Sequence, residues 1–390
     1  MLGIKRKQYF LISSQDFLTK TLFRYVCAVV IRYLKMGDQR IALILLLVLS
    51  FAISTLPLVS AAEDSWTTME PMPTAERGLG AAVVNGKIYA IGSNVNYEYD
   101  PATDTWTTKS SMTTARSGFG IAVYQDRIYV IGGEYGVYPN ITVTGINEVY
   151  NPATDTWETK TSMPTSRVGA HANAVDGRIY LISGITGGPN SVVTLNEVYD
   201  PETDTWTTKE PIPYPVNSYA SAVVDGKIYV IGGQDEYHDP MNLDLTQIYD
   251  PETNTWSQGT PIPAATIDAS AGVTTGTLAP ERIYVMGGDE GFLESSDQNY
   301  VYDPHADVWN AGTPIPTPRF NPAVAVLNDL VYVIGGFYGP GGPGYLPIAT
   351  VEQYTPIGYI PEFPSWIILP LFLTITSIIL VYRKRMKKVV

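Results

Sequence analysis

Short apolar runs that end beside glycines recur along the chain. Six of them read KIYAIGS from Lys87, RIYVIGG from Arg127, RIYLISG from Arg178, KIYVIGG from Lys227, RIYVMGG from Arg282 and LVYVIGG from Leu330. Runs this short, rich in Ile, Val and Tyr, predict β-strands. In five repeats a turn pair such as Asn85-Gly86 or Asp225-Gly226 comes just before the run, which predicts a tight hairpin with an earlier strand.

A second pattern follows each of the first five runs. It reads YDPATDTW ending at Trp106, YNPATDTW at Trp157, YDPETDTW at Trp206, YDPETNTW at Trp256 and YDPHADVW at Trp309. Pro suits the second position of a turn, and Asp, Asn and Thr stabilise turns locally. This pattern therefore predicts a turn between a third and a fourth strand, with the Trp packed between neighbouring sheets.

The two patterns repeat at a period of about 50 residues, which is typical of propeller arrays. The glycine pairs, Tyr and Trp at these offsets resemble the kelch motif over about residues 65–356. This resemblance implies an all-β, six-bladed propeller with four-stranded blades around a central channel. The sixth repeat ends at Gln353-Tyr354-Thr355-Pro356 without a Trp strand, whereas an orphan Ser65-Trp66-Thr67-Thr68 precedes the first repeat. We therefore expect the N-terminal strand to complete the last blade.

Both ends of the chain carry membrane or export signals. We predict a leader over residues 1–62, in which Arg40, an apolar run from Ile41 and small residues near Ala62 form a signal peptide. Translation is expected to start at Met36; the alternative is a genuine membrane anchor before it. The propeller then spans 63–356, a linker 357–365, a single transmembrane helix 366–382 and a basic cytoplasmic tail 383–390.

The C-terminal segment is also similar to archaeal PEF-CTERM sorting signals, because Pro361-Glu362-Phe363 precedes the apolar span and the basic cluster. This resemblance implies recognition by an archaeosortase-like enzyme and removal of the segment. A plain single-pass anchor fits the same residues. Either interpretation places the propeller outside the cell, attached to the cell membrane.

Charge and cysteine content exclude several functions. The first 40 residues and the last eight hold 13 of the 25 basic residues, so the body between them has a net charge of about −24. Such a body repels phosphates, so we predict no nucleic-acid partner. Cys27, in the leader, is the only cysteine, and His171, His238 and His305 occupy different repeat positions. We therefore predict no cofactor and no metal site.

The loops between the second and third strands differ most among the repeats, and they share one face with the links between blades. Variable loops on a rigid scaffold are where binding usually resides, so this face is the predicted binding surface. Its candidate ligand-contacting aromatics include Tyr135, Tyr138, Tyr237 and Tyr338. Asn140, in Asn140-Ile141-Thr142, is the only N-x-[ST] glycosylation acceptor of the propeller.

Four arginines precede the innermost strands in the links, namely Arg77, Arg116, Arg167 and Arg319, with Asn217 near that place in another repeat. In kelch domains the matching arginines often line the channel mouth, which implies a basic ring that captures an anionic group such as an acidic sugar. In the alternative interpretation, each Arg pairs with a neighbouring acid or backbone carbonyl.

Three function classes are compatible with these features. We expect an extracellular binding or adhesion module for a protein or glycan, without catalytic residues. The kelch resemblance also admits a sugar-modifying enzyme of the sialic-acid mutarotase type, for which Glu76 beside Arg77 and His171 are the candidate acid and base. A galactose-oxidase type of enzyme is excluded, because the propeller has no Cys for a Cys–Tyr cross-link. The third class is a structural component of the cell surface.

Overall fold

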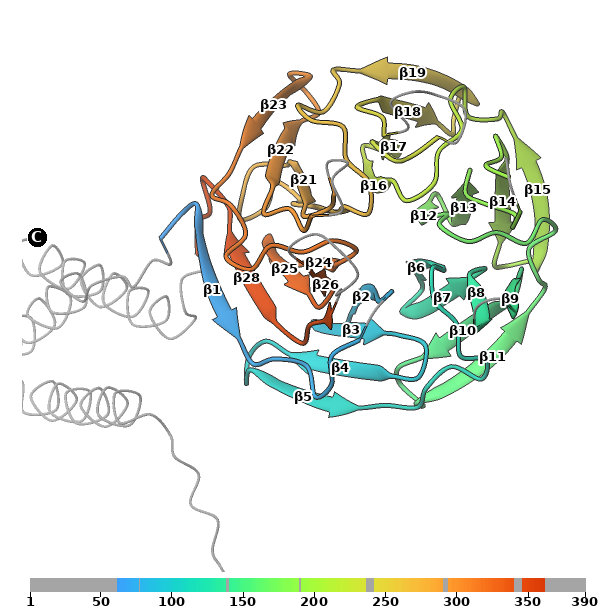
Figure 1. The fold of residues 1–390 in the computed structure, drawn as a ribbon, viewed down its shortest axis with the longest axis horizontal. Helices are drawn as coiled ribbons and strands as arrows, with labels where there is room; N and C mark the ends of the chain where they lie inside the picture. Colours follow the sequence, from blue (N-terminus) through green and yellow to red (C-terminus); the bar gives the residue numbers. More distant parts are fainter. Residues whose placement is uncertain are drawn as a thin grey trace, which may run out of the picture. The chain divides into compact units, whose positions relative to one another are not determined.

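A computed structural model of the chain describes residues 62–76, 78–137, 140–188, 191–235, 242–289, 294–339 and 346–361. Six four-stranded antiparallel sheets lie in a ring around a central axis (Figure 1). Residues 61–360 form one compact unit. The described residues contain strands and turns and no helix. The prediction of an all-β, six-bladed propeller is therefore confirmed.

Each blade is a meander of four strands. Blade 1 contains β2 (Gly80–Val84), β3 (Lys87–Ile91), β4 (Asn96–Asp100) and β5 (Thr105–Thr108). Blade 2 contains β6 (Gly120–Tyr124), β7 (Arg127–Ile131), β10 (Asn147–Asn151) and β11 (Thr156–Lys160). Blade 3 contains β12 (Ala172–Val175), β13 (Arg178–Ile182), β14 (Asn196–Asp200) and β15 (Thr205–Lys209).

The second half of the ring has the same plan. Blade 4 contains β16 (Ala220–Val224), β17 (Lys227–Ile231), β18 (Thr246–Asp250) and β19 (Thr255–Gly259). Blade 5 contains β20 (Ser270–Val273), β21 (Ile283–Met286), β22 (Asn299–Asp303) and β23 (Val308–Ala311). Blade 6 contains β24 (Ala323–Leu327), β25 (Leu330–Ile334), β28 (Val351–Thr355) and β1 (Ser65–Met69).

The core lies between adjacent blades. The second strand of every blade is buried on both faces, which explains why its Ile-Tyr-Val-Ile run does not alternate with polar residues. The fourth strand is largely exposed and forms the outer rim, and its Trp is a partly buried side chain in each blade. The apolar clusters combine residues of two neighbouring sheets; Ile128 of blade 2, for example, packs with Tyr89 of blade 1.

The Asp-x-Trp spacing of the repeats joins each blade to the preceding one. In blade 3, Asp204 Oδ1 accepts hydrogen bonds from Tyr199 Oη at 2.6 Å and from the backbone N–H of Thr161, in blade 2, at 2.8 Å. Trp206 Nε1 donates to the carbonyl oxygen of the same Thr161 at 2.9 Å. One residue at the end of each outer strand thus has both of its backbone groups bound by side chains of the next blade.

The ring closes through its N-terminal strand, as predicted. Strand β1 pairs antiparallel with β28, with Trp66 opposite Tyr354. Asp64 and Trp66 repeat the blade-to-blade contacts: Asp64 Oδ1 accepts from Tyr354 Oη at 2.7 Å and from Thr313 N–H at 2.7 Å, and Trp66 Nε1 donates to Thr313 O at 2.9 Å. The orphan Asp64-Ser65-Trp66 is therefore the missing Asp-x-Trp element of the sixth repeat.

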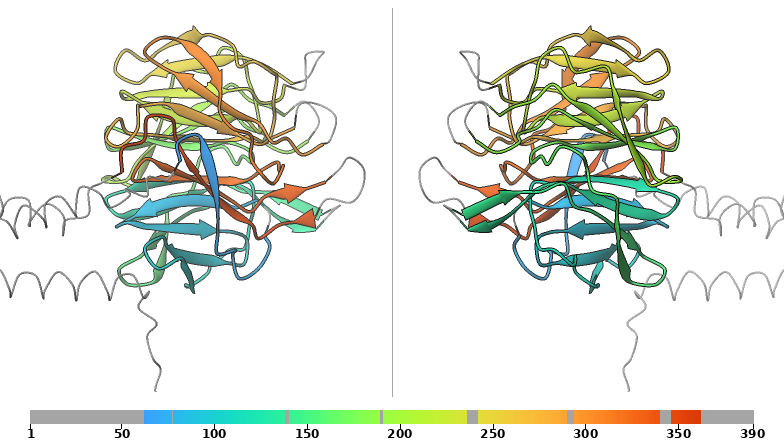
Figure 2. Two further views of the ribbon diagram at one scale, coloured as in Figure 1. Left: turned by 90° about the vertical axis from the view of Figure 1, so that its left-hand side faces the viewer. Right: turned by 90° about the vertical axis from the view of Figure 1, so that its right-hand side faces the viewer.

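Two small hairpins were not anticipated from the sequence. Strands β8 (Glu134–Val137) and β9 (Asn140–Val143) form one between the second and third strands of blade 2. Strands β26 (Phe337–Tyr338) and β27 (Leu346–Pro347) form the other in blade 6. Both project from the same side of the ring (Figure 2), which we call the loop face. The opposite side, which carries the turns after the first and third strands, is the turn face.

The expected leader, the linker beyond Pro361, the transmembrane segment 366–382 and the basic tail lie outside the described residues. Within the described residues, no helix has the length and apolar character needed to cross a membrane. The predictions about export and anchoring therefore stay predictions.

Candidate functional site

The links between blades meet at the channel on the loop face. Six residues with a left-handed backbone, φ between +51° and +68°, stand just before the innermost strands; we call them the link residues, and they are Gly78, Gly118, Gly169, Ser218, Asp268 and Asn321. Backbone hydrogen bonds join neighbouring links, such as Asp268 N–H to Ser218 O at 2.8 Å and Asn321 N–H to Asp268 O at 2.6 Å. The mouth of the channel is thus framed by backbone.

The three described arginines of the links do not form a basic ring at this mouth. Arg116, Arg167 and Arg319 lie two residues before a link residue, and each is at most 1% exposed. Each pairs with a buried glutamate of its own blade, namely Glu148, Glu197 and Glu352. Since a guanidinium buried and bonded in this way cannot contact a ligand, the expectation of anion capture by these three residues is wrong. The alternative, in which each Arg pairs with an acid or a carbonyl, is confirmed for these three arginines.

The arginines instead fasten the base of the loops. In blade 6, Arg319 donates to the carbonyl oxygens of Gly335 at 3.0 Å and Thr350 at 3.1 Å, the two ends of the loop between β25 and β28. Burial lowers the pKa of Arg319, and the charge of Glu352 works against that shift, so the guanidinium stays protonated. The pair is a structural clamp under the loop face.

The repeats contain a sequence signal for this Arg–Glu pairing that the prediction of a basic ring did not take into account. The glutamates Glu148, Glu197 and Glu352 each stand two residues before the Tyr of their repeat, and they occur in the blades that have the Arg. Blade 4 has Val216 and Gln247 at the two places, and blade 5 has Thr266 and Tyr300. Arg and Glu thus appear together or not at all in blades 2 to 6. Arg77 lies outside the described residues, and by repeat register it stands one residue after this place, where Glu76 falls.

A cavity of about 1020 Å³ occupies the channel and opens on the loop face. The first strands of all six blades and the link residues line it. Tyr135 and Ile141 of the β8–β9 hairpin and Phe337 of β26 also border it. Its polar side chains come from different blades and do not repeat; they include His171, Asn173, Ser221, Ser270, Asp268 and Asn321. A concave space with a few convergent polar groups is the usual form of a small-ligand site.

The charge inside this cavity is acidic. Glu134 and Asp268 are the carboxylate side chains that line it, and Arg116 is the one cationic residue among its described lining, with its guanidinium buried away from the space. Burial raises the pKa of Asp268, a hydrogen bond with Ser218 opposes the shift, and the charge of Asp289 adds to it. A neutral or cationic ligand group therefore fits the mouth better than an anion.

The candidate acid and base are not brought together. His171 borders the cavity, its ring lies 5.0 Å from that of Tyr219, and burial lowers its pKa to about 4, so the imidazole is neutral at pH 7. Glu76 belongs to the link of blade 1 and is not part of the described cavity lining. In the described part of the chain, the neutral imidazole of His171 therefore borders the channel, and Glu76 does not line the channel with it as the other member of an acid–base pair.

The other predicted site residues are scattered. Tyr135 is 40% exposed at the cavity rim, and Tyr338 is 44% exposed on β26. Asn217 is buried, and its Nδ2 donates to the carbonyl oxygen of Gln234 at 3.0 Å, so it supports a loop rather than offering a free amide. Asn140 begins β9 with an exposed side chain. Tyr138 and Tyr237 lie outside the described residues.

These features define a class of protein: a closed six-bladed β-propeller with a polar channel and loops of unequal length on one face. Comparison with protein families identifies it further. The family model described as the KLHDC2/KLHL20/DRC7 Kelch-repeats domain matches residues 118–336, and that of the Kelch motif matches residues 318–369. The chain belongs to the Kelch-repeat family.

More distant similarities agree with this fold. Beta-scruin of Limulus polyphemus is 35% identical over 89 residues, which is 22% of this chain and 9% of that protein. The chain thus spans about a tenth of the length of this curated relative. The solved structure of YjhT superposes with a TM-score of 0.62 at 18% identity, over 73% of this chain and 95% of that one. At that identity the likeness concerns the fold alone.

Proposed function

We propose that this propeller is a binding module that holds a partner at the channel mouth on its loop face. Kelch propellers typically serve as protein-binding modules. The observation that carries the proposal is the cavity of about 1020 Å³, whose walls are regular strands and whose rim consists of loops that differ from blade to blade. A rigid frame with non-repeating polar groups is suited to recognition.

The acidic charge of the channel mouth limits the kinds of ligand group that can bind there. Because Glu134 and Asp268 line the space and the three described link arginines are buried in ion pairs, we infer a neutral or amino-bearing group, such as a neutral glycan, an amino sugar or a lysine side chain of a protein. The exposed rings of Tyr135 and Tyr338 supply flat apolar surface for stacking. This inference replaces the acidic sugar that the sequence suggested.

A glycan array with neutral, amino and acidic sugars, probed with the purified full chain, tests this choice. We expect binding of neutral or amino sugars that weakens in Tyr135→Ser and Asp268→Asn. The matched control is Glu202→Ala, a change on the turn face. Binding restricted to acidic glycans, or unchanged in both variants, contradicts the proposal for glycans. If no glycan binds, cross-linking at position 135 to a surface protein tests the protein partner.

A sugar-modifying enzyme of the mutarotase type is the second candidate, and His171 favours it. Its imidazole borders the cavity and is neutral at pH 7, as a proton acceptor must be, but burial lowers its pKa to about 4 and so makes it a weak base. NMR exchange spectroscopy of sialic-acid anomers with the full chain and with His171→Gln measures this directly. Equal interconversion rates with the two proteins would rule out a role for His171.

We further propose that the propeller is presented outside the cell by its terminal segments. The apolar run from Ile41 and the span 366–382 with its basic tail support this in the sequence. N-terminal sequencing of the mature protein and protease shaving of intact cells test it. A mature start before Met36, or a propeller protected from protease in intact cells, would contradict it. A structural role at the surface is the remaining alternative, favoured if no ligand is found.

A further inference from the structure

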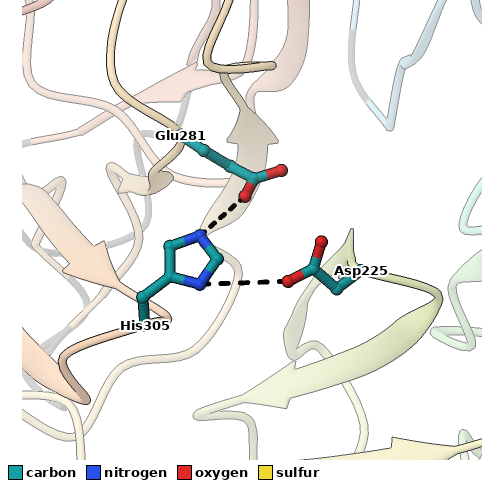
Figure 3. Close-up of side chains that lie close together, drawn as sticks. All are labelled: Asp225, Glu281 and His305. Carbon is teal, nitrogen blue, oxygen red and sulfur yellow. Dashed lines mark hydrogen bonds and ion pairs between the residues drawn. The ribbon is translucent and has the colours of Figure 1, made fainter.

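Three side chains that can bind metal ions meet on the turn face between blades 4 and 5 (Figure 3). Asp225 lies in the turn between β16 and β17, and Glu281 lies just before β21. His305 lies in the turn between β22 and β23. None of the three lines the channel cavity, so a function of this cluster is independent of the proposed ligand site.

The donor atoms converge. His305 Nε2 lies 2.9 Å from Glu281 Oε2, and His305 Nδ1 lies 3.9 Å from Asp225 Oδ2. One ligand atom from each of the three residues can be chosen so that all lie within 4.8 Å of one another. Around a tetrahedral Zn²⁺, donor atoms about 2.0–2.2 Å from the ion stand roughly 3.4 Å apart. A different imidazole nitrogen faces each carboxylate, so binding of one ion requires the ring and the carboxylates to rotate until one nitrogen and two oxygens reach that spacing.

The cluster depends on two departures from the repeat. Position 305 is Ala102, Ala153, Glu202 and Glu252 in the first four repeats, so blade 5 alone has His there. This position can reach the preceding blade: Glu202 Oε1 accepts from Tyr124 Oη of blade 2 at 2.8 Å. Blade 5 is also the one with a longer connection before its second strand, and that connection delivers Glu281.

The longer connection is held firmly. Asp329 of blade 6 accepts backbone hydrogen bonds from Thr275 at 2.6 Å, from Leu278 at 2.6 Å and from Ala279 at 3.0 Å. Burial works to raise the pKa of Asp329, but these bonds prevail and lower it, so the anchoring carboxylate is ionised at neutral pH. Glu281 therefore comes from a fixed loop rather than a loose one.

The two carboxylates of the cluster differ from several other carboxylates of the turn face in having no Lys or Arg partner among the described residues. In blades 1, 3, 4 and 5 the first residue of the second strand, or the residue just before it, forms an ion pair with the Asp that ends the third strand: Lys87–Asp100, Arg178–Asp200, Lys227–Asp250 and Arg282–Asp303. Among the described residues, neither the Asp225 nor the Glu281 carboxylate has a Lys or Arg partner. Two carboxylates thus share one imidazole on a chain of net charge −13, which attracts a cation.

We propose that Asp225, Glu281 and His305 bind a divalent transition-metal ion of the Zn²⁺ type, with water completing the coordination. One imidazole nitrogen and two carboxylate oxygens are a ligand set that Zn²⁺ accepts, whereas Ca²⁺ and Mg²⁺ prefer oxygen alone. The ion links blade 4 to blade 5 across the turn face. Because the native ring brings the ligands together, binding favours the folded state.

The same three side chains without a metal would be held together only by the contacts of the imidazole with the two carboxylates. That arrangement predicts stability independent of added metal and of chelator. The two interpretations differ in metal dependence alone, so the experiment must vary the metal while the protein stays the same.

The repeats supply substitutions that keep the fold. His305→Ala copies blades 1 and 2, which have Ala102 and Ala153 in this turn, and Asp225→Asn copies Asn85 and Asn328 of blades 1 and 6. Asp225 has φ +50°, and Asn85 and Asn328 have +50° and +53° at the corresponding place, so Asn suits the turn. Glu202→Ala, at the equivalent place in blade 3, is the matched control.

The full chain, stripped with EDTA and dialysed, is titrated with ZnCl₂ by calorimetry, and its thermal unfolding is followed with and without the ion. We expect one Zn²⁺ site that His305→Ala abolishes and Asp225→Asn weakens by about 10- to 100-fold, since even residues that only orient ligands are worth that much. The melting temperature should rise with Zn²⁺ in the parent and in Glu202→Ala and stay constant in His305→Ala. Equal Zn²⁺ binding by the parent and His305→Ala, or no binding by the parent, would overturn the proposal.

Discussion

Blades 3 and 4 are neighbours, and they fill the same two buried positions beneath the loop face with different side chains. In blade 3, Arg167 Nη2 lies 2.9 Å from Glu197 Oε2 in the interior. In blade 4 the two places hold Val216 and Gln247, and the Gln247 side chain exchanges hydrogen bonds with the backbone of Tyr214 at 3.0 and 2.9 Å. The backbone is the same in both: Gly133 donates to Arg167 O at 2.8 Å and Gly184 to Val216 O at 3.0 Å.

This difference shows that the blade needs the backbone latch, and that a polar side chain beneath it needs a partner, which either another side chain or the backbone can supply. A buried ion pair and a neutral amide bonded to the backbone both meet that condition. An arginine at this place in the sequence is therefore no evidence for an anion site. Each blade also serves as a natural control for its neighbour, so residues exchanged between blades test which of these contacts stabilise the fold.

The largest loss of stability is expected when one partner of the buried Arg167–Glu197 pair of blade 3 is removed. Arg167→Ala leaves Glu197 buried without its cation, and removal of one partner of a buried pair costs about 3–5 kcal/mol. Urea unfolding of the full chain, followed by tryptophan fluorescence, measures the loss. A change below about 1 kcal/mol would mean that the glutamate is solvated or protonated and that the pair is not a clamp.

Converting blade 3 to the blade 4 pair should recover much of that loss. The double variant Arg167→Val, Glu197→Gln carries the residues of Val216 and Gln247 and leaves no buried charge. Exchange of a whole buried pair for neutral residues is often near neutral, so we expect this variant to be more stable than Arg167→Ala by about 2 kcal/mol or more. Equal stability of the two variants in the same urea assay would show that the arginine packing, not the charge, matters.

A smaller effect is expected at the Asp-x-Trp joint. Blade 4 has Asn254 where blade 3 has Asp204, and both accept the bond from their Tyr at 2.6 Å. Asp204→Asn should therefore cost less than Asp204→Ala, for which the lost charged acceptor suggests about 1.5–3 kcal/mol; urea unfolding of both variants measures the two losses. Burial works to raise the pKa of Asp204, but the hydrogen bonds from Tyr199 and Thr161 prevail and hold it below its usual value.

The pH dependence of this joint is set by that depressed pKa. The ionised carboxylate stabilises the folded state above the unfolded pKa of about 3.9, and the gain is lost as pH falls through the lower folded pKa. The stability difference between the parent and Asp204→Asn should therefore shrink below about pH 4. A difference that stays constant from pH 7 to pH 3 in thermal melts would contradict the ionised bond.

The smallest effect is expected at the link residue of blade 5. Asp268 has a raised pKa, so its ionised form is unfavourable in the folded state, and its counterpart in blade 6 is Asn321. Asp268→Asn should raise the melting temperature at pH 7 by no more than about 2–4 °C, which corresponds to roughly 1 kcal/mol in a large domain. The gain should vanish below about pH 4, where Asp268 is protonated in both states. A lower melting temperature at pH 7 would point to a favourable contact of the carboxylate.

Much of the frame is determined by local sequence. Tyr199, Asp204 and Trp206 act within one short segment, and the same contacts recur at Asp64 and Trp66, which is why ring closure could be predicted. The β8–β9 and β26–β27 hairpins could not be predicted in the same way, because Tyr135, Gly136 and Ile141 belong to a loop that has no counterpart in the other repeats.

The roles of the arginines and of His305 were harder to predict from the sequence, for a different reason. Arg167 and Glu197 lie 30 residues apart, and their exposure depends on how the loop corner folds over them. Their joint occurrence within a repeat was the available signal. Nothing in one repeat indicates that His305 meets Asp225, because that contact crosses between blades and depends on the length of one connection.

The closing strand has a mechanical consequence. Ser65 lies opposite Thr355 and Met69 opposite Val351, so the chain enters β1 and leaves β28 at the same end of the pair. A pulling force applied to the two ends of the domain loads one hydrogen bond after another, as in opening a zipper, instead of shearing them all at once. The weakest direction of the ring is therefore the one along which its own ends are pulled. Tension would release β1, break the contacts of Asp64 and Trp66 with Thr313 of blade 5, and expose the edge of β28.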